Sequence, residues 1–218
     1  MDRHILTIIV CNALYLLAAL AWALGHGNYE FLVYIVVVLL VASVLFVIHR
    51  WHPLPPSLLW CMSAWGLMHM AGGLVIVPDG WPTTGGTNAL YNLWLIGDVL
   101  KFDQFVHAWG FGITAWLCWE ILKAMLAKGG AAPAPTLGKL TLCVAASMGF
   151  GALNEVIEFT LTVLVQNTNV GGYVNNSLDL VFNMFGAILA ALIIRWRSAG
   201  DTRLPDGQRG TGVTDKPL

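Results

Sequence analysis

The sequence predicts an all-α membrane protein, a polytopic bundle of about six transmembrane helices. Of its 218 residues, 57% are hydrophobic and only 11% are charged, and the mean hydropathy is +0.71. A soluble domain carries charge on about 25% of its residues. The second observation is the length of the apolar runs. Several reach the ~20 residues that are needed to cross a hydrocarbon core about 30 Å thick.

The six expected spans follow one another along the chain. Residues 5–24, 31–49 and 57–77 contain no Asp, Glu, Lys or Arg. Residues 97–122, 138–165 and 177–196 are also apolar, but each contains acidic residues. The segments HPLPP and GGAAPAPT separate neighbouring spans. A cleaved signal peptide is the alternative for the first run, but that run is long and lacks a good cleavage site, so we expect a retained helix.

The basic residues are unequally divided between the two sides that six spans define. The side with both termini collects ten of the eleven Lys and Arg residues, and the other side has only Lys101. By the positive-inside rule, both termini are predicted to be cytoplasmic. We expect one transmembrane domain over residues 1–197 and a disordered cytoplasmic tail over 198–218. The longest outer loop, 78–98, is interpreted either as an ordinary loop or as one with a short interfacial helix in ALYNLWLIGD.

Polar residues of four predicted spans fall at one depth, in the outer half of the bilayer, because the chain alternates in direction. In three of the spans they occur as pairs three or four residues apart, which places both members on one face of the helix. The third span adds a single histidine near its outer end. These residues are Asp103 and His107, Glu155 and Glu158, Asp179 and Asn183, and His69.

Such residues are too costly to face lipid, since one ionisable side chain at mid-membrane costs about 2.5–3.5 kcal/mol on insertion scales. We therefore expect a shared cavity, with His107 within about 8 Å of the nearer Glu carboxylate. Small residues on the same helix faces favour close packing. Imidazoles together with carboxylates suit a divalent metal such as Zn²⁺. The alternative is a polar cluster that only fixes helix packing, and for His69 alone a packing role is equally expected.

Four motifs occur in order between His69 and Leu192: LMHMAGG, FDQFVHAWGFG, NEVIEF and LDLVFNMFGAILAAL. In order and spacing they resemble the YjdF-type family of bacterial inner-membrane proteins. The D-x-x-x-H and D-x-x-x-N-x-x-G elements are also similar to VanZ-like proteins. The resemblance implies a multi-pass protein of the bacterial inner membrane. Two features depart from the YjdF-type pattern: Gln104 stands where that family has Arg, and residues 172–176 lack an Asp that it usually carries.

The leading functional hypothesis is a metal-assisted hydrolase or transferase that acts on a membrane lipid or a cell-envelope precursor. The alternatives are a proton-coupled transporter and a non-catalytic membrane scaffold. A nucleic-acid partner is not expected, because the chain has no basic stripe. The predicted roles are metal ligation by Asp103, His107, Asp179 and the outlying His69, general-base catalysis by Glu155 and Glu158, and substrate binding by Asn183 and Asn154.

Overall fold

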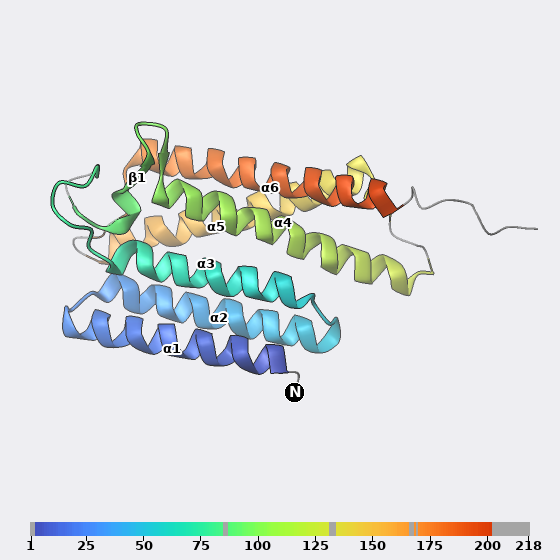
Figure 1. Cartoon of the computed structure of the whole chain (residues 1–218), viewed down its shortest axis with the longest axis horizontal. Coiled ribbons are helices and arrows are strands. Elements are labelled where there is room, and N and C mark those ends of the chain that lie inside the picture. The colour runs from blue at the N-terminus through green and yellow to red at the C-terminus, as the bar shows by residue number, and fades with distance from the viewer. Residues whose placement is uncertain (1–2, 85–86, 131–133, 166–167, 169, 202–218) are drawn as a thin grey trace, which may run out of the picture.

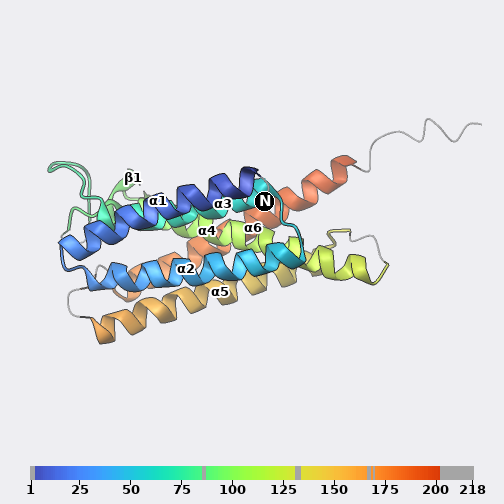
Figure 2. The same cartoon turned by 90° about the horizontal axis from the view of Figure 1, so that it is seen from below.

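The computed structural model describes residues 3–84, 87–130, 134–165, 168 and 170–201, with side chains described up to Ser198. Within these residues, six helices lie side by side along one axis (Figure 1 and Figure 2). They are α1 (Arg3–Gly25), α2 (Tyr29–Trp51), α3 (Pro56–Leu74), α4 (Phe102–Lys128), α5 (Leu137–Leu164) and α6 (Tyr173–Asp201). The predicted all-α bundle is therefore confirmed.

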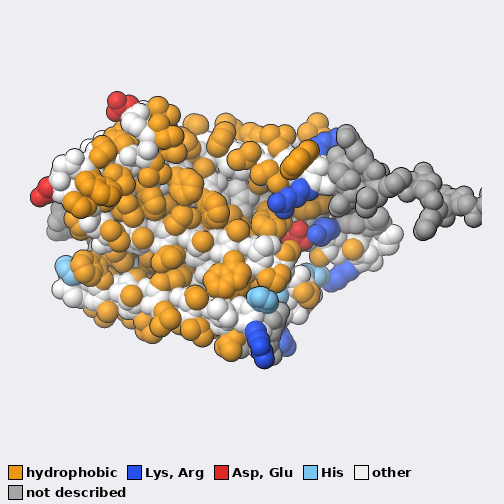
Figure 3. Space-filling model, in the orientation of Figure 1, with side chains coloured by type: hydrophobic (Ala, Val, Ile, Leu, Met, Phe, Trp, Pro, Cys, Tyr) orange, Lys and Arg blue, Asp and Glu red, His pale blue; other side chains and the backbone are white. Residues whose placement is uncertain are grey.

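The bundle has two distinct ends. α1 begins and α6 finishes at one end, which we name the terminal end (Figure 1). The long α3–α4 connection lies at the other, which we name the hairpin end. On the face seen in Figure 3, Lys and Arg side chains gather near the terminal end, and most of the remaining surface is apolar. An apolar flank with a charged end is the pattern expected of a bundle that lies in lipid.

Five of the six helices, α1, α2, α4, α5 and α6, are long and apolar enough to cross a membrane. α3 has 19 residues and falls outside this set, because Ser57, Ser63, His69 and three glycines dilute its apolar content. It nevertheless runs beside α2 in the bundle (Figure 1). Length and composition therefore support five of the six predicted spans.

The connection between α3 and α4 changes two predicted boundaries. α3 ends at Leu74, before the predicted residue 77, because Val75 is extended and the next residue pairs with Ala89 in an isolated bridge. α4 begins at Phe102, after the predicted residue 97. The residues before it form an antiparallel hairpin of β1 (Trp94–Ile96) and β2 (Leu100–Lys101).

Asp98 turns this hairpin with a φ of 53°, a left-handed conformation that Asp adopts more readily than most residues. The interfacial helix considered for ALYNLWLIGD is wrong, since its described helical part is only the 3₁₀ turn η1 (Leu90–Asn92). α6 is longer than predicted at both ends. Residues 198–201, expected in a disordered tail, continue this helix. The rest of the predicted tail, 202–218, lies outside the described residues.

The most extensive contact between helices joins α4 and α6. A β-carbon added at Gly186 would lie 1.9 Å from the carbonyl oxygen of Ala108, and one added at Gly112 would lie 3.0 Å from the carbonyl oxygen of Gly186. The two backbones therefore approach as closely as small residues permit, which is how transmembrane helices gain packing energy. α5 packs against both helices, so that α4, α5 and α6 form one group.

α1, α2 and α3 form the other group, which contacts the first mainly through α3 and α4. A core cluster near the hairpin end also brings Leu161 of α5 against this group, beside Phe31 and Tyr34 of α2. Figure 1 shows α5 behind α4, approaching the first group near the hairpin end and diverging from α2 toward the terminal end. The boundary between the two groups is therefore packed at one end and looser along its length, where it contains a cavity described below.

We predict that Gly186→Ala destabilises the bundle, because the new methyl group must push the α4 backbone away. Overpacking a tight contact costs about 1–3 kcal/mol. The matched control is Gly149→Ala on α5, where an added β-carbon meets nothing within 4 Å. Thermal unfolding of the two variants in the same detergent measures the difference. Equal melting temperatures for both variants would contradict the close α4–α6 contact.

Candidate functional site

α4 places Asp103 and His107 one helical turn apart at the hairpin end. His107 Nε2 lies 3.7 Å from Asp103 Oδ1, and only 7% of the His107 surface is exposed. The start of the helix is fixed by Gln104, whose Oε1 accepts a hydrogen bond of 2.8 Å from the backbone N–H of Lys101. Gln104 is thus a helix cap. The hairpin and this cap together set the direction of the Asp103 side chain.

α6 contributes an acid and two amides that meet these α4 residues. Asn183 Oδ1 lies 3.0 Å from His107 Nδ1, which donates to it when that nitrogen carries the proton. Asn175 Nδ2 donates to Asp179 Oδ2 at 2.6 Å and to Asp103 Oδ2 at 3.2 Å. Its Oδ1 accepts a hydrogen bond from Lys101 Nζ. Asn175 therefore bridges two carboxylates and connects them to a buried cation.

α5 brings two further carboxylates to the same imidazole. Glu155 Oε1 lies 3.8 Å from His107 Nδ1, which confirms the predicted approach within about 8 Å. The other oxygen of Glu155 accepts a hydrogen bond of 2.6 Å from Asn176 Nδ2. Asn154 Nδ2 donates to Glu158 Oε1 at 2.7 Å, one turn further along α5. Each of these Glu side chains is therefore held by one amide.

Two overlapping sets of side chains have ligand atoms within 4.8 Å of one another, close enough to share one metal ion: Asp103, His107 and Asp179, and His107, Glu155 and Glu158. The set of Asp103, His107 and Asp179 is the better candidate for a metal site. When His107 Nδ1 donates to Asn183, the lone pair on Nε2 is free and faces Asp103. A hydrogen bond on one ring nitrogen commonly fixes a metal-binding histidine in this way.

Three buried polar atoms in the described part of the chain have no hydrogen-bond partner: Glu155 Oε1, Asp179 Oδ1 and Asn183 Nδ2. Asp179 and Asn183 are fully buried, and Glu155 is 6% exposed. Buried polar atoms are nearly always hydrogen-bonded, and leaving them unpaired is costly. The unpaired Glu155 oxygen lies 3.8 Å from His107 Nδ1, and Asp179 has a carboxylate oxygen within 4.8 Å of a His107 ring nitrogen, so the cluster has unused capacity for a cation or a polar ligand.

His69, predicted as an outlying ligand, is not in either set. The Tyr91 hydroxyl donates to the His69 carbonyl oxygen at 2.8 Å, and the same hydroxyl oxygen lies 2.7 Å from His69 Nδ1. Gly72 lets the Tyr91 ring approach His69 this closely, because a β-carbon at position 72 would lie 2.3 Å from that ring. Burial, and then the nearby charge of Asp103, raises the pKa of the Tyr91 hydroxyl well above its ordinary value. The contacts of His69 are therefore those of a packing residue.

Four residues of the cluster and its surroundings were missed by sequence reasoning: Lys101, Asn175, Asn176 and Tyr91. Asn175 precedes Asp179 by four residues, so helical spacing offered a signal for it. Lys101 is the lone basic residue on its predicted side and lies next to the hairpin turn. Glu120 of α4 lies outside both sets and pairs with Lys123 at 2.5 Å.

The comparison with protein families adds an independent observation. The profile of a family described as "Predicted membrane protein (DUF2238)" matches residues 5–199, nearly the whole described chain. The chain belongs to this membrane-protein family. No curated protein and no solved structure matches it. Membership of the DUF2238 family agrees with the apolar helices and supports a location in a membrane.

For this DUF2238 chain we predict that Tyr91→Phe lowers stability by about 0.5–1.5 kcal/mol near neutral pH, because it removes the hydroxyl that binds His69. The raised pKa keeps Tyr91 protonated in the folded protein. Above pH 10 the unfolded chain loses that proton, which favours unfolding of the wild type only. The difference between wild type and variant should therefore shrink as the pH rises above 10.

Thermal unfolding at neutral pH and above pH 10 measures this effect. Tyr29→Phe is the matched control, because Tyr29 is 68% exposed at the start of α2. If the stability lost by Tyr91→Phe stays constant or grows above pH 10, the Tyr91 hydroxyl does not stay protonated in the folded state.

Proposed function

We propose that this protein is a metal-assisted hydrolase or transferase that acts on the polar head of a membrane lipid or a lipid-linked envelope precursor. The observation that carries the proposal is the pair of buried, unpartnered carboxylate oxygens, on Asp179 and Glu155, around His107. A cluster that served only to hold helices together would be expected to satisfy its buried polar atoms. A divalent cation beside His107 would pair with the Asp179 oxygen and offset the burial of the neighbouring carboxylates, and the Glu155 oxygen would stay free to accept a proton.

In this proposal, Asp103, His107 Nε2 and Asp179 hold the metal. Three protein ligands would leave a coordination position for water, as in catalytic zinc sites, and a bound metal would supply an activated water for hydrolysis. Asn183 orients the imidazole. Glu155 and Glu158 approach the same imidazole from α5 and are the candidate general bases.

A cavity beside the cluster supports a substrate with a hydrocarbon chain. It has a volume of about 150 Å³ and lies between α1, α2, α3 and α5, where the two helix groups meet. Its walls are mostly apolar, from Ile5 and Leu59 toward the terminal end to Ile157 of α5. It reaches Asn154, which in turn holds Glu158. A chain in this cavity would keep its polar head beside the acids of the site.

The alternative of proton-coupled transport requires a relay of ionisable groups toward the terminal end. The acid of α4 in that direction, Glu120, is neutralised by Lys123 and also accepts a hydrogen bond of 3.2 Å from Trp116 Nε1. It is therefore a poor relay group.

The location that we propose is the bacterial inner membrane with cytoplasmic termini, on the basis of the basic-residue asymmetry and of the YjdF-type and VanZ-like motifs. The asymmetry is carried by residues such as Arg3 and Arg50 near the terminal end and by Lys101 at the hairpin end.

We predict that the protein, purified without chelators and supplied with Zn²⁺, retains about one divalent ion per chain. His107→Asn and Asp179→Asn should weaken retention by at least about 10-fold, because each removes a proposed ligand. Mass spectrometry of the metal content measures this. Glu120→Gln is the control, since that acid lies outside both ligand sets, and it should retain the ion. Wild-type protein without stoichiometric metal would refute the metal site.

Thermal unfolding provides a second arm of this experiment. Zn²⁺ at about 100 times its dissociation constant should stabilise the wild type by about 2.7 kcal/mol. Asp179→Asn should show no such gain, although in chelator it should melt no lower than the wild type, because it removes a carboxylate that shares Asn175 with Asp103. Equal stabilisation of both proteins would place the ion elsewhere.

The catalytic part of the proposal predicts a difference between wild type and Glu155→Gln. Each is incubated with a bacterial membrane lipid extract and Zn²⁺, and the lipids are then compared by mass spectrometry. We expect at least one lipid species to lose or exchange its head group with the wild type, at a rate about 10²–10⁴-fold lower for the variant. Identical lipid profiles for wild type, variant and a no-protein sample would contradict an enzymatic role.

A further inference from the structure

A second and larger hollow lies on the outside of the bundle, between α4 and α6. It has a volume of about 1000 Å³ and is separate from the cavity beside the acids. Its floor lies below the surrounding side chains because the residues along the close α4–α6 contact are small, including Gly112, Gly186 and Ala190. Its walls carry large apolar side chains: Phe105, Trp109, Trp116, Phe185, Leu189 and Ile193. We name this hollow the α4–α6 groove.

The two ends of the α4–α6 groove differ in charge. At the hairpin end it is lined by Ile96 and Val99 of the hairpin, which are 57% and 67% exposed. At the terminal end it is lined by Glu120, Lys123 and Arg197. The apolar surface of the view in Figure 3, with Lys and Arg near the terminal end, includes this region. The groove is therefore apolar along most of its length and charged at one end.

Cations outnumber acids at that charged end. Lys123 is paired with Glu120, whereas the exposed side chain of Arg197 makes no ion pair with an acid among the side chains that the structure describes, which end at Ser198. Pro135, which also lines the groove, accepts a hydrogen bond of 3.0 Å from Arg195 Nη1. Two cations, Lys123 and Arg197, thus line this end of the groove against one acid, Glu120, and this excess favours an anionic group at the mouth of the groove.

We propose that the α4–α6 groove binds one anionic phospholipid. Its phosphate pairs with Arg197, whose planar guanidinium binds phosphate in a fork, and with the exposed ammonium of Lys123. Its acyl chains lie along the small-residue floor toward Phe105 and Trp109. A zwitterionic lipid fits less well, because its own ammonium group would lie among the cations. This proposal is independent of the metal site, which lies on the inner faces of α4, α5 and α6.

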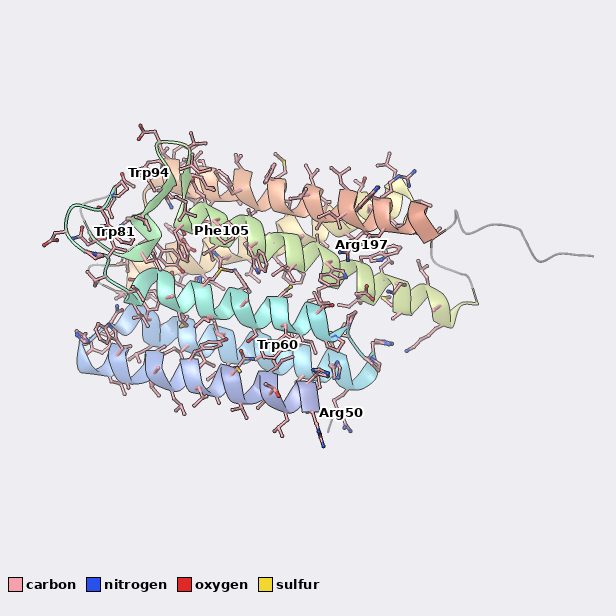
Figure 4. All side chains as sticks on the ribbon, in the orientation of Figure 1. Arg50, Trp60, Trp81, Trp94, Phe105 and Arg197 are labelled. Atoms are coloured by element: carbon pink, nitrogen blue, oxygen red, sulfur yellow. The ribbon has the colours of Figure 1, made fainter. Side chains whose placement is uncertain are left out.

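The pairing of the lipid phosphate with Arg197 is tested by comparing Arg197→Gln with Arg50→Gln. Figure 4 shows Arg197 between α6 and α4, whereas Arg50 lies at the end of α2, away from the groove. Both substitutions remove one exposed cation near the terminal end. The purified full chain is titrated with phosphatidylglycerol or phosphatidylcholine in mild detergent, and bound lipid is counted by native mass spectrometry.

We expect the wild type to bind one phosphatidylglycerol in preference to phosphatidylcholine. Arg197→Gln should weaken phosphatidylglycerol binding about five-fold, because one cation near a membrane surface contributes ~1 kcal/mol to anionic-lipid binding. Arg50→Gln should leave that binding unchanged. Equal binding of the two lipids, or equal weakening by the two substitutions, would overturn the proposal.

A second variant tests the groove without changing its charge. Ala190→Trp fills the floor that the acyl chains would occupy, and Ala190 is not part of the metal-binding sets. The folded variant should lose the retained phosphatidylglycerol while keeping its Zn²⁺ content, and its melting temperature in lipid-free detergent should fall, because the new side chain lies beside the close α4–α6 contact. Undiminished phosphatidylglycerol binding by a folded Ala190→Trp variant would place the lipid elsewhere and refute the groove as its site.

Discussion

The close contact between α4 and α6 at Gly186 is the constraint on which both proposed sites depend. Without a side chain at this position, the α6 backbone reaches the carbonyl oxygen of Ala108. Ala108 follows His107 directly, and Gly186 lies one turn after Asn183, so this contact sets the separation of the His107–Asn183 pair. On the outside of the bundle, the same absence of side-chain volume leaves the floor of the α4–α6 groove. One steric feature thus positions an interior cluster and an exterior hollow.

The interior cluster is held mainly by amides. Asn175, Asn176 and Asn154 each donate to a carboxylate, and Lys101 reaches the cluster through Asn175. An amide can donate to an acid whether or not that acid is charged, since it adds no charge of its own. The acids can therefore change their charge, or receive a cation, while their hydrogen-bonded framework stays in place. This combination of fixed geometry and variable charge is what a ligand-binding site requires.

The sequence was sufficient to predict which residues share a depth, because helix rise and alternating chain direction determine depth. It was also sufficient to pair Asp103 with His107 and Glu155 with Glu158, since helical spacing puts each pair on one face. Depth alone could not place His69, because a lone residue gives no information about which side of its helix faces the cluster. The amides Asn175 and Asn176 gave a weak signal, since neutral residues contribute little to an argument based on the cost of burying charge. The β1–β2 hairpin was not predicted, because the segment LIGDV is equally compatible with the edge of an apolar span.

The distribution of the cluster over α4, α5 and α6 has a consequence for how the protein is made. During synthesis, Asp103 and His107 enter the membrane on α4 about 70 residues before Asn175 and Asp179 are translated. Until α6 arrives, Asp103 and Glu155 lack the amides that donate to them, and each is costly to expose to lipid. The nascent chain must therefore keep these two helices near water or near the insertion machinery until the last helix is complete. Assembly of the polar centre has to wait for α6, and a chain that stopped short of α6 would carry Asp103 and Glu155 without their amide partners.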